Sequence, residues 1–423
     1  MAPASLMSLP VELVHKICEN LCRHCTCTPR ELQKGDLSLN GEAALSCLSK
    51  TCRRLREIAQ PVLYHYVETG RNWNFLRSII ARPDLAAHVR GLHHGWTSDS
   101  IREDVDIVAA IQAHKRLQTR IGAHEHYPRC SGHPHVLELI SARLPNAEEL
   151  AIDMDDMPRW ESVIQLKSVR RLHLFAYDDI DCLDSLGSFL SAMPCLEGLN
   201  MQVEPWLSSS LPVTEVRSLD LEAKWLTAPN LTLMVKSCPK LERFRYHCVL
   251  QPGPEEGTLT WPQTQHILYP LRKTLKHVNF SNVPYGSPVP QQLRRDLGSF
   301  RNLDGLETLW MDISRAIPKR WKPRTPRFPA NTTDVVDMLP ESLRVVYFRG
   351  LDQRWHGIEM LASAIQGGHF PRLKTVVVQQ VGAALNKSCR VLAAVGVGCE
   401  SIPDASEDGR HIFPEGGFWE TCG

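Results

Sequence analysis

A short apolar pattern recurs through most of the 423-residue chain, and it constrains the fold more than any other feature. Each copy has an apolar residue, two variable residues, a second apolar residue, one variable residue and a third apolar residue. The nine copies begin at residues 147, 169, 196, 216, 241, 275, 306, 343 and 373. The step between copies runs from 20 residues, between 196 and 216, to 37 residues, between 306 and 343. Such a series predicts stacked units that bury one continuous core.

The segments between the copies indicate what each unit contains. Six copies follow a proline, at position 145, 194, 212, 239, 340 or 371, where it can end a helix before an extended segment. Apolar residues at helical spacing predict helices over 184–193, 229–237, 334–339 and 357–366. Each unit is therefore predicted to hold a helix, a proline turn and a strand. A weaker copy at 89–92 and a helix at 101–117 are expected before the first clear unit.

The N-terminal segment follows a different pattern, which predicts three short helices. In residues 9–21 one apolar set recurs every four positions and a second set lies one position further on, so one side of the helix is apolar. These sets are Leu13, Ile17 and Leu21, and Val14 and Cys18. Two further helical patterns cover 42–49 and 50–60. Helices this short are too small for a full core, so we expect them to pack against a partner or the following domain.

Three ordered blocks in these helices form a motif. They are Leu9-Pro10-x-Glu12-Leu13-x-x-x-Ile17-x-x-x-Leu21, Leu45-x-x-Leu48-x-x-x-Cys52-Arg53-Arg54-Leu55 and Ala59-Gln60-Pro61-Val62-Leu63-Tyr64. The motif resembles an F-box of the kind common in filamentous fungi, although the stretch from Cys22 to Asn40 is longer than the usual first connection. The resemblance implies docking on a Skp-type adaptor, which links the chain to a cullin and a RING subunit. The implied adaptor-binding residues are Leu9, Pro10, Leu13, Ile17, Leu21, Leu45, Leu48, Cys52 and Leu55.

The repeated triplets are similar to the leucine-rich repeats that follow many F-boxes, but the asparagine that usually closes each repeat is absent. The predicted fold is α/β, with a short helical F-box before an irregular leucine-rich-repeat-like solenoid. The predicted boundaries are an F-box-like domain at 5–68, a helical linker with the first irregular repeats at 69–143, the solenoid at 144–401 and a C-terminal tail at 402–423. The resemblance implies a non-catalytic substrate-recognition subunit of a ubiquitin ligase. The alternative is a repeat-based interaction scaffold that does not assemble with a cullin.

In each triplet, the residue between the second and third apolar residues is the candidate for contact with a target protein. Since side chains alternate across a strand, this residue is expected to face away from the core. The nine positions hold Ala151, His173, Asn200, Asp220, Arg245, Asn279, Trp310, Tyr347 and Val377. Because Arg, Trp and Tyr often anchor interfaces, the predicted substrate-binding residues are Arg245, Trp310, Tyr347 and Arg349.

Two stretches contain residues that can bind a metal ion. Cys22-x-x-Cys25, with His24 between them and Cys18 and Cys27 nearby, has the spacing of half a zinc site. No second pair follows at finger spacing. The stretch from His124 to His135 is rich in histidine but lacks His-Glu-x-x-His. We therefore predict no metal or cofactor, and a metal-dependent hydrolase is the third interpretation.

Composition and missing motifs narrow the remaining function classes. No Gly-x-Ser-x-Gly or phosphate-binding loop is present, so the sequence predicts no catalytic residue. A formal net charge of +1 does not favour nucleic acid or a membrane surface as the main partner. The absence of a spanning or signal segment predicts a protein of the cytoplasm or nucleus with reduced thiols. The basic segment 315–327 could serve as a nuclear address or contact an acidic partner.

Overall fold

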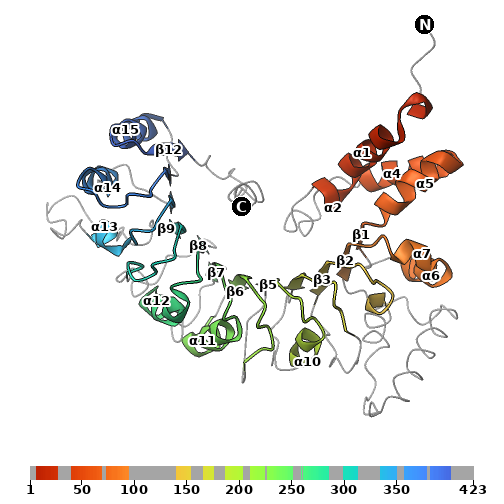
Figure 1. Cartoon of the computed structure of the whole chain (residues 1–423), viewed down its shortest axis with the longest axis horizontal. Helices are drawn as coiled ribbons and strands as arrows, with labels where there is room; N and C mark the ends of the chain where they lie inside the picture. The colour runs from red at the N-terminus through yellow and green to blue at the C-terminus, as the bar shows by residue number, and fades with distance from the viewer. Residues whose placement is uncertain are drawn as a thin grey trace, which may run out of the picture. The chain divides into compact units, whose positions relative to one another are not determined.

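The computed structural model is drawn in Figure 1, with its helices and strands labelled. It describes residues 6–26, 40–68, 73–94, 140–153, 165–175, 186–202, 210–223, 226–250, 259, 261–284, 299–312, 334–349, 357–378 and 382–401. The chain divides into two compact units. Of the described residues, those up to 175 and those from 188 to 196 belong to the first unit, while 186–187 and those from 197 onward belong to the second. The domain boundaries drawn from the sequence remain predictions.

The first unit opens with a small helical cluster, as the sequence predicted. Its elements are a short 3-10 helix η1 (Leu6–Ser8) and helices α1 (Val11–Leu21), α2 (Arg23–Thr26), α4 (Asn40–Thr51) and α5 (Arg53–Leu63). The third predicted helix begins three residues late, because Cys52 has an extended backbone with φ of −155°. A shared apolar core joins these helices. It consists of Val14, Cys18, Cys22, Leu45, Leu55, Ile58, Ala59 and Val62.

Four parallel strands follow in the same unit, with two helices between the first two strands. The strands are β1 (Tyr66–Glu68), β2 (Gly91–His94), β3 (Glu149–Asp153) and β4 (Arg171–Phe175), and the helices are α6 (Trp73–Ala81) and α7 (Pro83–Ala86). The weak repeat at 89–92 is thereby confirmed as part of a strand, since Leu92 pairs with Leu150. Strand β1 has no apolar triplet, and the sequence did not predict it.

In the described part of the second unit, helices separate most of the successive strands. Its strands are β5 (Gly198–Gln202), β6 (Ser218–Ala223), β7 (Arg243–Leu250), β8 (His277–Pro284), β9 (Thr308–Asp312), β10 (Val345–Arg349), β11 (Thr375–Val378) and β12 (Gly398–Ser401). Its helices are α11 (Ala228–Ser237), α12 (Trp261–Leu268), α13 (Asp334–Met338), α14 (Gly357–Gln366) and α15 (Gly382–Ala393), with η4 (Tyr269–Leu271) after α12. Helix α10 (Leu186–Ser191) precedes β5, and its first two residues belong to the second unit and the others to the first. These five helices, α11 to α15, lie on one side of the strands (Figure 1).

The second and third residues of all nine apolar triplets lie on strands, and the first residue lies two positions before the strand. The strands are ordered β1 to β12 in a 12-stranded sheet, and the pairs within each unit are parallel, which confirms the α/β class. Within each unit, the middle apolar residue of a triplet pairs with the middle residue of the triplet on the next strand. In the second unit this row is Leu199, Leu219, Phe244, Val278, Leu309, Val346 and Val376, and each is at most 2% exposed. Among the described residues, the predicted order of helix, proline and strand is found before β5, β7, β10 and β11.

A second row, of charged residues, lies one position before the strands. From β2 to β10 these residues alternate in sign: Arg90, Glu148, Arg170, Glu197, Arg217, Glu242, Lys276, Glu307 and Arg344. In each unit the backbone N–H of one donates to the carbonyl oxygen of the one before, as from Glu242 to Arg217 at 2.8 Å. Side chains also pair: Glu242 lies 2.7 Å from Arg217 and 2.9 Å from Lys276. We call this row the charge ladder.

Glycine 41 tests the packing of the helical cluster. A Cβ atom at this position would strike the carbonyl oxygen of Leu21 at the end of α1. Gly41→Ala should therefore lower the free energy of unfolding by about 1–3 kcal/mol, measured as a shift of the denaturant midpoint. Gly187→Ala is the matched control, since nothing lies within 4 Å of its Cβ position. Equal stability of the two variants would contradict the close approach of α4 to α1.

The charge ladder gives a second prediction, for acid pH. The hydrogen bond from Lys276, and then the charge of Lys276 and the pairing with Arg217, hold the pKa of Glu242 below its ordinary value of 4.5. A carboxyl group with a lowered pKa contributes stability above pH 4.5 that is lost as the pH falls further. Glu242→Gln should cost up to about 1 kcal/mol at pH 7, and this difference should shrink in denaturant titrations below pH 4.5. A difference independent of pH would show that the charge is not its cause.

Candidate protein-docking surfaces

An exposed apolar stripe on α1 is the first candidate surface. Leu13 is 52% exposed and Ile17 is 36% exposed, although both are large apolar residues. Four of the five large hydrophobic residues that are exposed in the described part of the chain lie between Met7 and Ile17; the fifth is Tyr269. Exposed apolar side chains that gather in one place mark interaction surfaces more often than single ones do. We call Pro10, Leu13 and Ile17 the α1 stripe.

The geometry of the helix explains why this stripe is left uncovered. Val14 and Cys18 are 1% and 0% exposed and face the core. Leu13 and Ile17 each stand one position earlier, and so about 100° around a helix of 3.6 residues per turn. The apolar side of α1 is therefore wider than the part of the helix that the core covers, and the edge with Leu13 and Ile17 faces solvent.

The start of α1 is fixed by the neighbouring helix. The Arg54 guanidinium in α5 donates to the carbonyl oxygens of Met7 at 2.7 Å and Leu9 at 2.9 Å. These bonds hold the residues that lead into the helix, where Pro10 occupies the N-cap position with φ of −53°. The α1 stripe is thus presented on a fixed backbone, which lowers the entropy that a partner must remove on binding.

The other residues of the predicted adaptor-binding set are more buried. Leu45 and Leu55 are 1% and 5% exposed and belong to the core, because their helices pack on the side of Val14. Leu9, Leu21, Leu48 and Cys52 are partly buried and pack against that core. Of the predicted set, Pro10, Leu13 and Ile17 are therefore the residues most exposed to solvent, and the others pack in or against the core.

A row of side chains along the sheet of the second unit is the second candidate surface. Asp220, Arg245, Asn279, Trp310, Tyr347 and Val377 are register partners from β6 to β11, as the repeat predicted. We call them the central row. Their exposure differs from the expectation of an open surface, since Asn279, Trp310, Tyr347 and Val377 are all less than 9% exposed.

Contacts between neighbours in the central row account for part of this burial. The rings of Trp310 and Tyr347 are stacked, with centroids 4.5 Å apart and planes 16° from parallel. Two stacked rings cover one face of each other, which removes much of their accessible area. Arg245 lies 3.5 Å from Asp220, and their side chains keep 18% and 27% of their exposure. Arg349 is in β10 opposite Asp312, and its side chain lies outside the described residues.

A third group of residues, of cysteine and histidine, could hold a metal ion. The structure brings together Cys22, His24, Cys25 and His65. The first three belong to the stretch that the sequence indicated, but His65 is 40 residues further on and no spacing pointed to it. Cys18 is instead a core residue, and Cys27 and the stretch from His124 to His135 lie outside the described residues, as does the basic segment 315–327.

Comparison with known proteins adds no assignment to these surfaces. No family model matches the chain, and no curated protein matches it. Among the described residues, none of the helices has the length and apolar character that crossing a membrane requires.

The stacked pair of the central row leads to a stability prediction. Trp310→Ala should lower the free energy of unfolding by about 3–5 kcal/mol, because a buried indole and its stacking partner lose their contacts. Tyr269→Ala is the control, since Tyr269 is 44% exposed and its ring lies under the Arg272 guanidinium, so its loss should cost less than about 1 kcal/mol. Denaturant midpoints measure both effects. A small effect at Trp310 would mean that the ring is available to a partner.

Proposed function

We propose that the chain is the substrate-recognition subunit of a Skp/cullin/F-box-type ubiquitin ligase. In this proposal residues 5–68 are an F-box and the parallel strands belong to a leucine-rich-repeat-like solenoid. The F-box docks on a Skp-type adaptor, and the repeats hold a target protein that remains to be identified. The covalent chemistry belongs to other subunits, and this chain contributes the proximity and orientation of the target. Such a subunit acts in the cytoplasm or the nucleus.

One observation carries the proposal: Leu13 and Ile17, two of the three large apolar side chains that α1 leaves exposed, belong to the F-box motif. The motif residues Pro10, Leu13 and Ile17 form the stripe that the rest of the cluster leaves uncovered. A helix with Val14 and Cys18 already in a core has no need of further apolar residues for its own folding. An apolar partner surface is the simplest reason for them, because burying each such side chain contributes about 1.5–3 kcal/mol.

The repeat region supports the second half of the proposal. It presents one strand per unit in parallel register, so side chains from many repeats form continuous rows. We place target binding at Arg245, Trp310, Tyr347 and Arg349. Arg245, which keeps partial exposure, would contact the target, while the stacked Trp310 and Tyr347 would hold the row in shape.

The test is capture of a Skp-type adaptor and a cullin by the purified full chain. The variant Leu13→Ser with Ile17→Ser should weaken adaptor capture at least about tenfold, since it removes apolar area from the interface. Its folding should be unchanged, because both side chains are exposed in the free chain. Binding constants from titration and circular dichroism measure the two quantities.

Val11→Ser is the matched control for this experiment. Val11 is 49% exposed and apolar, but it lies about 60° to the other side of Val14 around the helix. The control should bind the adaptor like the parent chain. Equal capture by all three proteins would refute the α1 stripe as the docking surface. No capture by the parent chain would favour an interaction scaffold that works without a cullin.

A further inference from the structure

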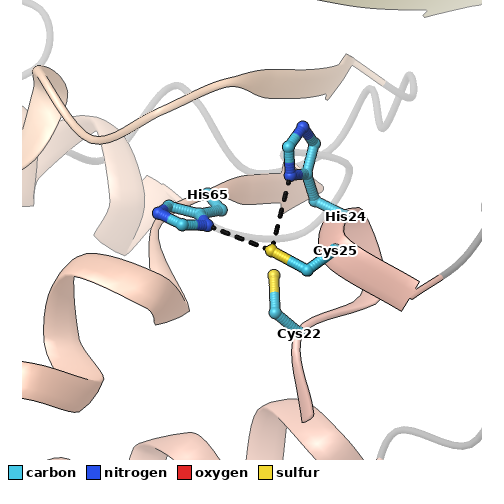
Figure 2. A group of neighbouring side chains, drawn as sticks. All are labelled: Cys22, His24, Cys25 and His65. Atoms are coloured by element: carbon cyan, nitrogen blue, oxygen red, sulfur yellow. Dashed lines mark hydrogen bonds between the residues drawn. The ribbon is translucent and has the colours of Figure 1, made fainter. Parts of the chain in front are cut away.

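The turn between α1 and α2 places two thiols close together. Cys22 ends α1, and its carbonyl oxygen accepts three hydrogen bonds: from the backbone N–H of Cys25 at 3.1 Å, the backbone N–H of Thr26 at 3.1 Å and the Thr26 hydroxyl at 2.9 Å. The backbone of Cys22-x-x-Cys25 is therefore fixed without any help from its side chains. In this conformation the two Sγ atoms point into the same space, as Figure 2 shows.

His65 reaches this space from a different part of the chain. It follows α5, and its carbonyl oxygen accepts hydrogen bonds from the backbone N–H groups of Arg90 at 2.9 Å and Gly91 at 2.8 Å. These bonds attach His65 to the start of β2. Its Nδ1 lies 3.4 Å from the Cys25 Sγ, and the Nδ1 of His24 lies 3.8 Å from the same sulfur (Figure 2).

The four side chains have the dimensions of a tetrahedral metal site. One ligand atom from each of Cys22, His24, Cys25 and His65 lies within 4.8 Å of all the others. A tetrahedral zinc ion with bonds of about 2.3 Å to sulfur and 2.0–2.1 Å to nitrogen holds its ligand atoms about 3.3–3.8 Å apart. The distances from the Cys25 Sγ to the two histidine nitrogens, 3.4 Å and 3.8 Å, agree with this range, so small side-chain movements would complete the coordination.

The chemistry of the donors selects the ion. Two thiolates and two imidazoles suit zinc in a tetrahedral site, whereas calcium and magnesium require oxygen ligands. A neutral imidazole ring has one nitrogen lone pair that it can donate to a metal ion. Two thiolates balance the charge of a divalent ion, and the occupied site is neutral. That balance suits a place where Cys22 is only 3% exposed.

We propose that Cys22, His24, Cys25 and His65 form a structural zinc site that fastens the helical cluster to the first strands of the sheet. On binding, each thiol releases its proton to solvent and forms a sulfur–zinc bond, with no oxidation or reduction. All four positions are filled by protein, so no open position remains for a substrate. The test of this site does not depend on the proposed adaptor docking, because zinc binding can be measured on the chain alone.

The experiment measures zinc in the purified full chain after dialysis against metal-free buffer. The parent chain should retain about one zinc ion per chain, while Cys25→Ser and His65→Asn should lose it. Cys47→Ser and His15→Asn are the controls, since both residues are exposed and outside the cluster, and they should keep the ion. Removing zinc with a strong chelator should lower the melting temperature of the parent by several degrees and leave that of His65→Asn unchanged.

Two further readouts keep the proposal testable if a variant fails to fold. His65→Cys replaces one zinc ligand by another and should restore the ion that His65→Asn loses. Cobalt added to the metal-free parent should give the visible absorption of a tetrahedral ion with a sulfur-to-cobalt charge-transfer band. A parent chain with no stoichiometric zinc and no such band would overturn the proposal. So would a folded His65→Asn variant that keeps both the ion and the tetrahedral spectrum.

Discussion

Contact between equivalent apolar residues of successive strands is the interaction on which the rest of the structure depends. Leu219, Phe244, Val278, Leu309 and Val346 pair one after another, and all are almost fully buried. No single unit could bury its own apolar side, so each strand is stable because of the next one. Both the central row and the charge ladder have their spacing because this apolar row fixes the register of the backbone.

The helical cluster meets a different constraint, since it must be stable and still leave an apolar surface free. It does so by dividing the arc of α1: Val14 and Cys18 enter the core, and the flank with Leu13 and Ile17 stays outside. The contacts that Arg54 makes with Met7 and Leu9 hold the free flank in position. If the proposed zinc ion is present, the opposite end of α1 is held as well, through Cys22.

The sequence allowed the strands from β2 to β11 and most of the helices to be predicted, because the signals that define them are local; β1 and β12 have no apolar triplet and were not predicted. The triplets place Leu150, Leu199 and Leu309 on strands, and the range 357–366 predicted for α14 agrees with the observed one. The burial of Trp310 and Tyr347 could not be predicted in this way. It depends on which residues are register partners in neighbouring strands, and Trp310 and Tyr347, which stack on each other, are 37 residues apart in the chain.

The full set of candidate metal ligands could not be predicted either, because it also depends on contacts between residues that are far apart in the sequence. Cys22 and Cys25 are visible as a pair because only two residues separate them, but His65 joins them only through the packing of α5 and the bonds from Arg90 and Gly91. Exposure on α1 was also not readable from the sequence. A wide apolar arc shows that one side of a helix is apolar, but the size of its neighbours decides how much of that side is covered.

The charge ladder has a consequence for how the chain avoids mistakes in folding. Strands with nearly the same apolar pattern could pair out of order, since Leu219 would fit beside Val278 about as well as beside Phe244. Omitting one unit would bring Arg217 next to Lys276, and Glu242 next to Glu307, because the signs alternate along the ladder. Each such error replaces an attraction by a repulsion. The alternating charges therefore disfavour a stack in which one repeat is skipped, whereas the apolar row alone does not distinguish that stack from the correct one.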